Sequence, residues 1–188
     1  MEAFLVSGVT IAMAEIGDRT QLLSLVLVMR FRKPLPIIAG ILCATLANHA
    51  AAGLVGVWVG NLFRPKVLDI LVAVSMMAMA LWTLKPDTLD EATAAVTAAS
   101  AFFATVSGFF VAEMGDKTQI ATVALAAAYP GLAFVVAGTT LGMLAANVPV
   151  VLLGHAFADR LPLKTIHFAA SALFLIVGAV FLCRALWR

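Results

Sequence analysis

The chain has 188 residues, of which 63% are hydrophobic and 12% are charged, and its formal net charge is +2. A soluble domain carries about a quarter charged residues, so this composition excludes that class and indicates an integral membrane protein. The small net charge, with basic residues spread over segment ends, also excludes a nucleic-acid-binding protein.

Six apolar segments are each long enough to cross a membrane as a helix, which requires about 20 residues. We predict spans near residues 3–29, 35–60, 66–84, 99–128, 131–157 and 162–187. The segments 3–29 and 99–128 are longer than a bilayer requires, which indicates tilting or an interruption. The first segment continues past signal-peptide length, so we expect a retained span. The predicted fold class is therefore all-α, a polytopic membrane protein with six transmembrane helices.

The polar segment 85–98 is the only polar linker between the predicted spans. It separates a first three-helix repeat, residues 1–84, from a second three-helix repeat, residues 99–188. Its acids, Asp87, Asp90 and Glu91, fit a solvated loop better than a lure for cations. Basic residues are slightly more frequent on the face that carries this loop, which places the loop in the cytoplasm.

A heptapeptide in the first half returns in the second half. The sequence Glu15–Gln21 (EIGDRTQ) recurs 98 positions later as Glu113–Gln119 (EMGDKTQ), and glycines 40 and 56 recur at the same offset. Because each half has an odd number of spans, the second half enters the membrane from the opposite face. The chain is thus predicted to form two inverted three-helix repeats, an architecture typical of secondary transporters.

Each heptapeptide places two carboxylates near the middle of an apolar segment, where ionisable residues are costly and usually functional. Residues three apart share a helix face, so Glu15 pairs with Asp18 and Glu113 with Asp116. Together they predict a four-carboxylate metal site at the midplane of the membrane. An all-oxygen site suits Ca²⁺, Mn²⁺ or Mg²⁺. Desolvation and like charge favour protonation of clustered carboxylates, so such a site can bind either protons or a metal ion.

Other residues of the two motifs have supporting roles in this interpretation. The glycines at positions 17 and 115 lower the cost of a helix interruption, which would free carbonyl groups. Arg19 and Lys117 each follow a Glu by four residues, which predicts an ion pair within one helix. The alternative is that these charges form a buried lock between two helices, although buried pairs seldom add net stability. Further candidate ligands, or hydrogen-bond partners of the acids, are Gln21, Gln119, Thr20 and Thr118.

Polar residues outside the motifs allow more than one interpretation. Asn48 and Asn147 lie near the middles of two spans and could coordinate the ion, bond to a motif acid or link helices. His49 is better explained as a packed, hydrogen-bonded side chain than as a proton relay. Cys43 and Cys183 are expected to be buried apolar residues without a disulfide. The pairs Gly56/Gly60 and Gly138/Gly142 are expected to permit close helix approach.

Two copies of Glu-x-Gly-Asp-(Lys/Arg)-Thr resemble the signature of uncharacterised protein family 0016. This family comprises Golgi-type calcium/manganese transporters and bacterial manganese exporters, and it is similar to the lysine-exporter superfamily. The resemblance covers essentially the whole chain. It implies a six-helix inverted-repeat transporter of Mn²⁺ or Ca²⁺, with its acidic ligands at Glu15, Asp18, Glu113 and Asp116. The short chain further favours a prokaryotic plasma membrane.

These features predict a secondary active transporter that exports divalent cations, with Mn²⁺ favoured over Ca²⁺, in exchange for protons. A passive divalent-cation channel is the alternative. An ATP-driven pump is not expected, because the sequence has no P-loop pattern. An enzyme is not expected either, because neither His-x-x-His spacing nor a nucleophile beside a base is present. The expected partners are the metal ion as substrate, protons as the coupling ion and the lipid bilayer, with no resident cofactor. The sequence leaves the oligomeric state open.

Overall fold

A computed structural model describes residues 1–85, 100–154 and 163–187, and the regular elements in these ranges are all α-helices. The all-α fold class is therefore confirmed. The acids of the predicted central loop lie outside the described residues. The helices are α1 (Glu2–Glu15), α2 (Arg19–Phe31), α3 (Pro34–Leu62), α4 (Pro65–Thr83), α6 (Ala101–Glu113), α7 (Lys117–Ala128), α8 (Leu132–Leu153) and α10 (Leu163–Trp187).

Four of these helices, α3, α4, α8 and α10, are long and apolar enough to cross a membrane alone. They coincide with the segments predicted near 35–60, 66–84, 131–157 and 162–187. The other two predicted segments are interrupted. The segment 3–29 consists of α1 and α2, and the segment 99–128 consists of α6 and α7. The sequence predicted either tilting or an interruption for these long segments, and both segments are interrupted.

Both interruptions have the same backbone geometry. Helix α1 ends at Glu15 and α2 begins at Arg19, while Gly17 between them has a φ of 84°. In the second copy Gly115 has a φ of 72°. Glycine adopts these left-handed angles without the clash that a Cβ atom would cause, so the repeated glycine produces the repeated break.

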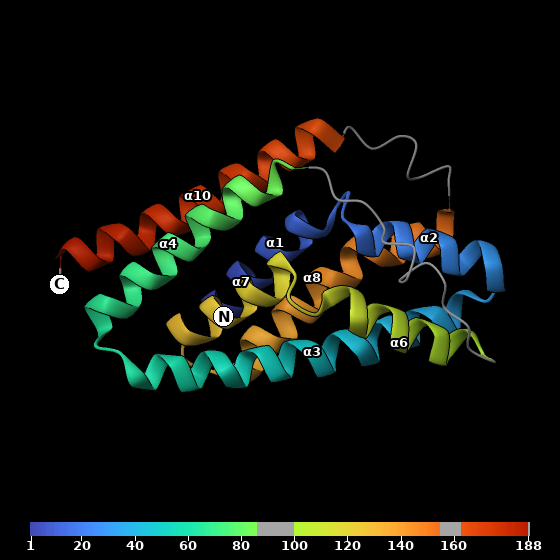
Figure 1. Ribbon diagram of the computed structural model, residues 1–188, viewed down its shortest axis with the longest axis horizontal. Helices are drawn as coiled ribbons and strands as arrows, with labels where there is room; N and C mark the ends of the chain where they lie inside the picture. The colour runs from blue at the N-terminus through green and yellow to red at the C-terminus, as the bar shows by residue number, and fades with distance from the viewer. Residues whose placement is uncertain (86–99, 155–162, 188) are drawn as a thin grey trace.

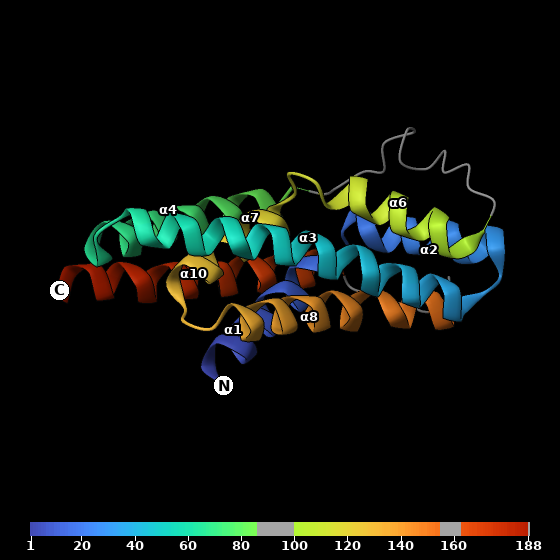
Figure 2. The same ribbon diagram turned by 90° about the horizontal axis from the view of Figure 1, so that it is seen from below.

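Figure 1 shows an elongated bundle, with α4 and α10 side by side along one edge and α3 along the opposite edge. Helices α1 and α7 lie to the left of the two breaks, and α2 and α6 lie to the right, in both Figure 1 and Figure 2. The path from α1 to α2 therefore runs opposite to the path from α6 to α7. Both chain termini lie left of the centre of the molecule.

Glycines bring helices from the two halves into backbone contact. A Cβ atom on Gly138 of α8 would overlap the carbonyl oxygen of Phe4 in α1, and one on Gly142 would lie 2.5 Å from the Gly8 oxygen. Gly56 and Gly60 bring α3 equally close to the backbone of α7. The predicted role of both glycine pairs in close helix approach is confirmed.

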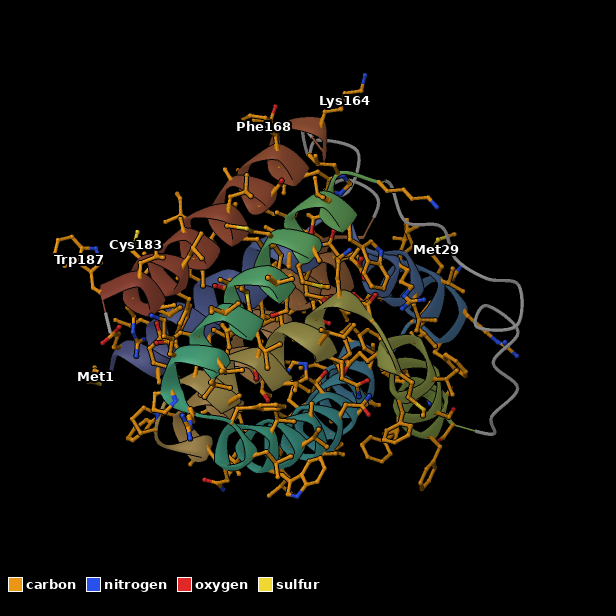
Figure 3. All side chains as sticks on the ribbon, turned by 60° about the vertical axis from the view of Figure 1, so that its left-hand side comes forward. Met1, Met29, Lys164, Phe168, Cys183 and Trp187 are labelled. Carbon is orange, nitrogen blue, oxygen red and sulfur yellow. The ribbon has the colours of Figure 1, made fainter. Side chains whose placement is uncertain are left out.

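The outside of the bundle is apolar. Phe168 and Trp187 project from α10 away from the other helices, with exposed fractions of 70% and 91% (Figure 3). Soluble monomers rarely expose such continuous apolar surface, so this surface fits a lipid environment. Cys43 and Cys183 are free thiols, as expected, but both are exposed, so their predicted burial is wrong. In a membrane protein an apolar position can face lipid as readily as the core.

Candidate functional site

The two helix breaks present carboxylates at their edges. Glu15 is the last residue of α1, and Asp18 is the N-cap residue of α2. Likewise, Glu113 is the last residue of α6, and Asp116 is the N-cap residue of α7. An N-cap aspartate usually accepts a hydrogen bond from a backbone N–H of its own helix, but neither aspartate side chain makes this capping bond. Both are thus available for contacts across the molecule.

The motif glutamines stabilise the breaks. The side-chain oxygen of Gln21 accepts a hydrogen bond from the Gly17 backbone N–H at 2.8 Å, and that of Gln119 accepts one from Gly115 at 2.7 Å. The Gln21 amide nitrogen donates to the Ala146 carbonyl of α8. The amide oxygens predicted as additional ligands are therefore engaged by the unwound backbone.

Three carboxylates converge between the two halves. Glu15, Asp18 and Asp116 each offer one oxygen, and these oxygens all lie within 4.8 Å of one another. The exposed fraction of each residue is at most 1%. We call this set the three-carboxylate group. Its donors are all oxygen atoms, the ligand type that hard divalent cations prefer. Thr20 and Thr118 support it, since Thr20 donates to Glu15 and Thr118 donates to Asp116.

The basic motif residues form ion pairs between the halves. Arg19 contacts Asp116 with a nitrogen-to-oxygen distance of 2.8 Å, and Lys117 contacts Asp18. The predicted pairs within one helix, from Glu15 to Arg19 and from Glu113 to Lys117, are wrong. The four-residue rule requires a continuous helix, and the chain unwinds between the members of each pair.

Glu113 is not a member of the three-carboxylate group. Thr45 of α3 donates a hydrogen bond to its Oε1 at 2.8 Å, and Asn48 donates one to its Oε2 at 3.2 Å. These bonds hold the carboxylate against α3, so the prediction that all four acids converge is corrected to three plus one. His49 Nε2 lies 3.9 Å from Glu113 Oε2, and both ring nitrogens lack hydrogen-bond partners. The expected hydrogen bond of His49 is thus absent from the part of the chain described.

The two asparagines have different roles. Asn48 bonds to a motif acid and to the Phe110 carbonyl, so it links α3 to α6. Asn147 accepts a hydrogen bond from Ser24 of α2 and donates to the Met143 carbonyl, so it links α8 to α2.

Sequence reasoning missed Thr45 and Asp69. Thr45 precedes Asn48 by three residues on the same helix face, a signal that could have identified it. Asp69 of α4 is 3% exposed and lies 3.9 Å from Arg184 of α10, so it belongs to the packing of these two helices.

The chain is similar to a known protein family and to several known proteins. The family described as "Divalent cation/proton antiporter GDT1" matches residues 3–91 and 101–187. A Vibrio cholerae protein named "Putative manganese exporter" is 51% identical over 179 residues, covering 95% of this chain and 89% of that relative. The "GDT1-like protein sll0615" of Synechocystis is 26% identical and covers 96% of each chain.

A plant relative resembles part of the chain. "Protein PAM71, chloroplastic" of Arabidopsis thaliana is 41% identical over 85 residues, which cover 45% of this chain and 23% of the plant protein. No solved structure matches the chain.

Proposed function

This chain belongs to the divalent cation/proton antiporter family GDT1, and from this premise we propose that it exports divalent cations, with Mn²⁺ favoured over Ca²⁺, in exchange for protons. GDT1 is a transporter family and not an enzyme family, in keeping with a chain that moves ions. The observation that carries the proposal is the three-carboxylate group, which combines Glu15 and Asp18 of the first half with Asp116 of the second.

The transport cycle that we propose is alternating access by two inverted three-helix repeats. Three observations support this architecture. The family match divides into residues 3–91 and 101–187. The two interrupted segments run in opposite directions (Figures 1 and 2). Arg19 and Lys117 occupy equivalent motif positions, as do Asp18 and Asp116. The ion pair Arg19–Asp116 is therefore the repeat equivalent of the ion pair Lys117–Asp18. Rocking one half against the other would open a site at their interface to each side in turn.

The ion pairs across the halves suggest a role for the two basic residues. Asp18 and Asp116 each contact a cationic side chain of the opposite half. An arriving divalent cation competes with Lys117 and Arg19 for the same carboxylates. We propose that the basic side chains compensate the acids when metal is absent and move away when it binds, which would couple metal occupancy to the contact between the halves.

Manganese is the proposed substrate for two reasons. The Vibrio cholerae relative with 51% identity carries a manganese exporter name, and the three-carboxylate group provides the hard oxygen ligands that suit Mn²⁺. Ca²⁺ accepts oxygen ligands as well, so direct comparison of the two ions is needed. We further propose that the protein lies in a prokaryotic plasma membrane, with the central loop in the cytoplasm.

The test is transport by purified protein in sealed vesicles with an imposed pH gradient. We expect saturable Mn²⁺ flux that follows the gradient and moves protons in the opposite direction. Uncoupled conductance without saturation would instead support the alternative of a passive channel.

Site variants test the residue assignment in the same assay. Glu15→Gln and Asp116→Asn should each abolish flux, whereas Glu2→Gln, at an exposed carboxylate near the N-terminus, should retain it. Normal transport by both site variants would show that the carboxylates are not the cation ligands.

A further inference from the structure

His49 is a buried histidine for which the packing of the helices provides no hydrogen bond. It lies on α3, its exposed fraction is 0%, and neither ring nitrogen has a hydrogen-bond partner among the described residues. Buried polar atoms in native proteins almost always have a partner, and an exception calls for an explanation. The side chain of His49 faces Glu113, the motif acid that is separate from the three-carboxylate group.

We propose that His49 and Glu113 form a second cation position, beside the three-carboxylate group, which takes a first-row transition-metal ion in preference to Ca²⁺. This position deepens the proposed function, on which it rests, by assigning part of the metal selectivity to a residue outside both motifs.

The distance between the two side chains fits two ligands of one ion. His49 Nε2 lies 3.9 Å from Glu113 Oε2, which is too far for a hydrogen bond. Nitrogen and oxygen ligands lie about 2.0–2.2 Å from a first-row divalent ion such as Zn²⁺, so two of them on opposite sides of the ion can be separated by up to about 4.4 Å. The observed separation is within this limit, and the ion would supply the partner that Nε2 lacks.

Neighbouring side chains hold Glu113 in a fixed orientation. Thr45 and Asn48 donate to different oxygens of the carboxylate, at 2.8 Å and 3.2 Å. Both donors are on α3, the same helix as His49, so one rigid element positions the two candidate ligands. Hydrogen bonds of this kind orient carboxylate ligands in metal sites and leave further lone pairs for the ion.

The position is adjacent to the three-carboxylate group and chemically different from it. Glu113 and Asp116 flank the same helix break, so Glu113 lies next to one member of the three-carboxylate group. An imidazole nitrogen suits transition metals, whereas Ca²⁺ prefers six to eight oxygen ligands. In the second half, the residue at the offset of 98 from His49 is Asn147, whose side chain is already bonded to Ser24 and Met143. The nitrogen ligand therefore comes from the first half of the chain.

The direct test is electron spin-echo spectroscopy of Mn²⁺ bound to the purified full-length protein. We expect the ¹⁴N modulation of a coordinated imidazole. The chain has three histidines. The control is the double variant His155→Gln/His167→Gln, which keeps His49 and should retain the modulation. His49→Gln should lose it.

Binding affinities measure the selectivity. His49→Gln, and His49→Asn, which introduces the residue of the second half, should weaken Mn²⁺ binding by about tenfold or more, since even residues that only orient a ligand cost 10–100-fold. Ca²⁺ binding should change much less, so the preference for Mn²⁺ over Ca²⁺ falls.

The outcomes separate this inference from the proposed function. If the unaltered protein binds and transports Mn²⁺ but shows no imidazole modulation, the second cation position is refuted while the exporter stands. If His49→Gln weakens Mn²⁺ and Ca²⁺ binding equally, the assigned selectivity is refuted. Failure of the unaltered protein to bind Mn²⁺ would overturn the proposed function and this inference with it. The spectrum of the unaltered protein decides the question even if the His49 variants do not fold.

Discussion

The side chain of Lys117 is only 3% exposed, whereas the side chain of its repeat counterpart, Arg19, is 24% exposed. Both residues contact an aspartate of the opposite half, but water screens the Arg19 pair more than the Lys117 pair. A partly exposed ion pair contributes little to stability, whereas removing one member of a buried pair leaves a poorly compensated charge. The two equivalent motif positions should therefore differ in their importance for folding.

This difference predicts unequal losses of stability. Lys117→Met should lower the free energy of unfolding by about 3 kcal/mol or more, and Arg19→Met should lower it by less. The double variant Asp18→Asn/Lys117→Met should recover part of the loss, because the buried charge is then removed as well. Unfolding of the detergent-solubilised protein by denaturant or heat measures these changes. Equal losses for the two single variants would contradict the argument from burial.

At the scale of the element, the interruption between α6 and α7 depends on Gly115. A Cβ atom at this position would meet no atom within 4 Å, so only the left-handed backbone excludes larger residues. Gly115→Ala should therefore cost about 1–2 kcal/mol of stability from backbone strain alone. Gly115→Asn should cost less, because asparagine tolerates these angles better than alanine. Thermal unfolding of both variants tests this order, and a neutral alanine variant would show that the backbone can relax.

The contact between α1 and α8 depends on a different property of glycine, its small size. Gly138→Ala would push a methyl group into the Phe4 carbonyl. We expect a loss of about 1–3 kcal/mol, the usual cost of overpacking. Leu141→Ala on the same helix is the matched control, because Leu141 is 51% exposed on the outer surface and should matter little. If the two substitutions have equal effects, the helices do not pack as closely as the glycines indicate.

At the scale of the whole molecule, three spans in each half would put both termini on one side of the membrane and the central loop on the other. In a background where Cys43 and Cys183 are replaced by alanine, Glu2→Cys should react with an impermeant maleimide from outside the cell. Asp90→Cys should react only in inverted vesicles. Labelling of both positions from the same side would exclude three spans per half.

The proposed exchange of metal for protons would also depend on the whole molecule, since the three-carboxylate group combines residues of both halves. If protons and metal compete for the same oxygens, Mn²⁺ binding should release protons and should weaken as the pH falls. Calorimetry in two buffers of different ionisation enthalpy measures the released protons. Binding of Mn²⁺ that is independent of pH would remove the basis for coupling at this site.

The sequence by itself determined the membrane class, the repeat and the candidate acids. These features depend on local composition and on the fixed offset of 98 residues between the motifs. The positions of the helix breaks could also be predicted from the sequence. Each of the two overlong apolar segments contains a motif glycine, and the backbone freedom of glycine is a local property that does not depend on tertiary contacts. The close helix approach at Gly138 and Gly142 was predictable for the same reason, since it requires only a missing side chain.

Only the tertiary structure decided which charged groups meet. Because each motif helix is interrupted, residues four positions apart in the motif do not share one helix face. Arg19 and Lys117 instead contact acids of the opposite half. Glu113 differs from Glu15 because Thr45 and Asn48 of α3 bind it. These partners come from helices that are distant in sequence, and their distances depend on how the helices pack. The motifs thus supply the candidate ligands, and the packing of the two halves decides which of them lie close enough together to share one ion.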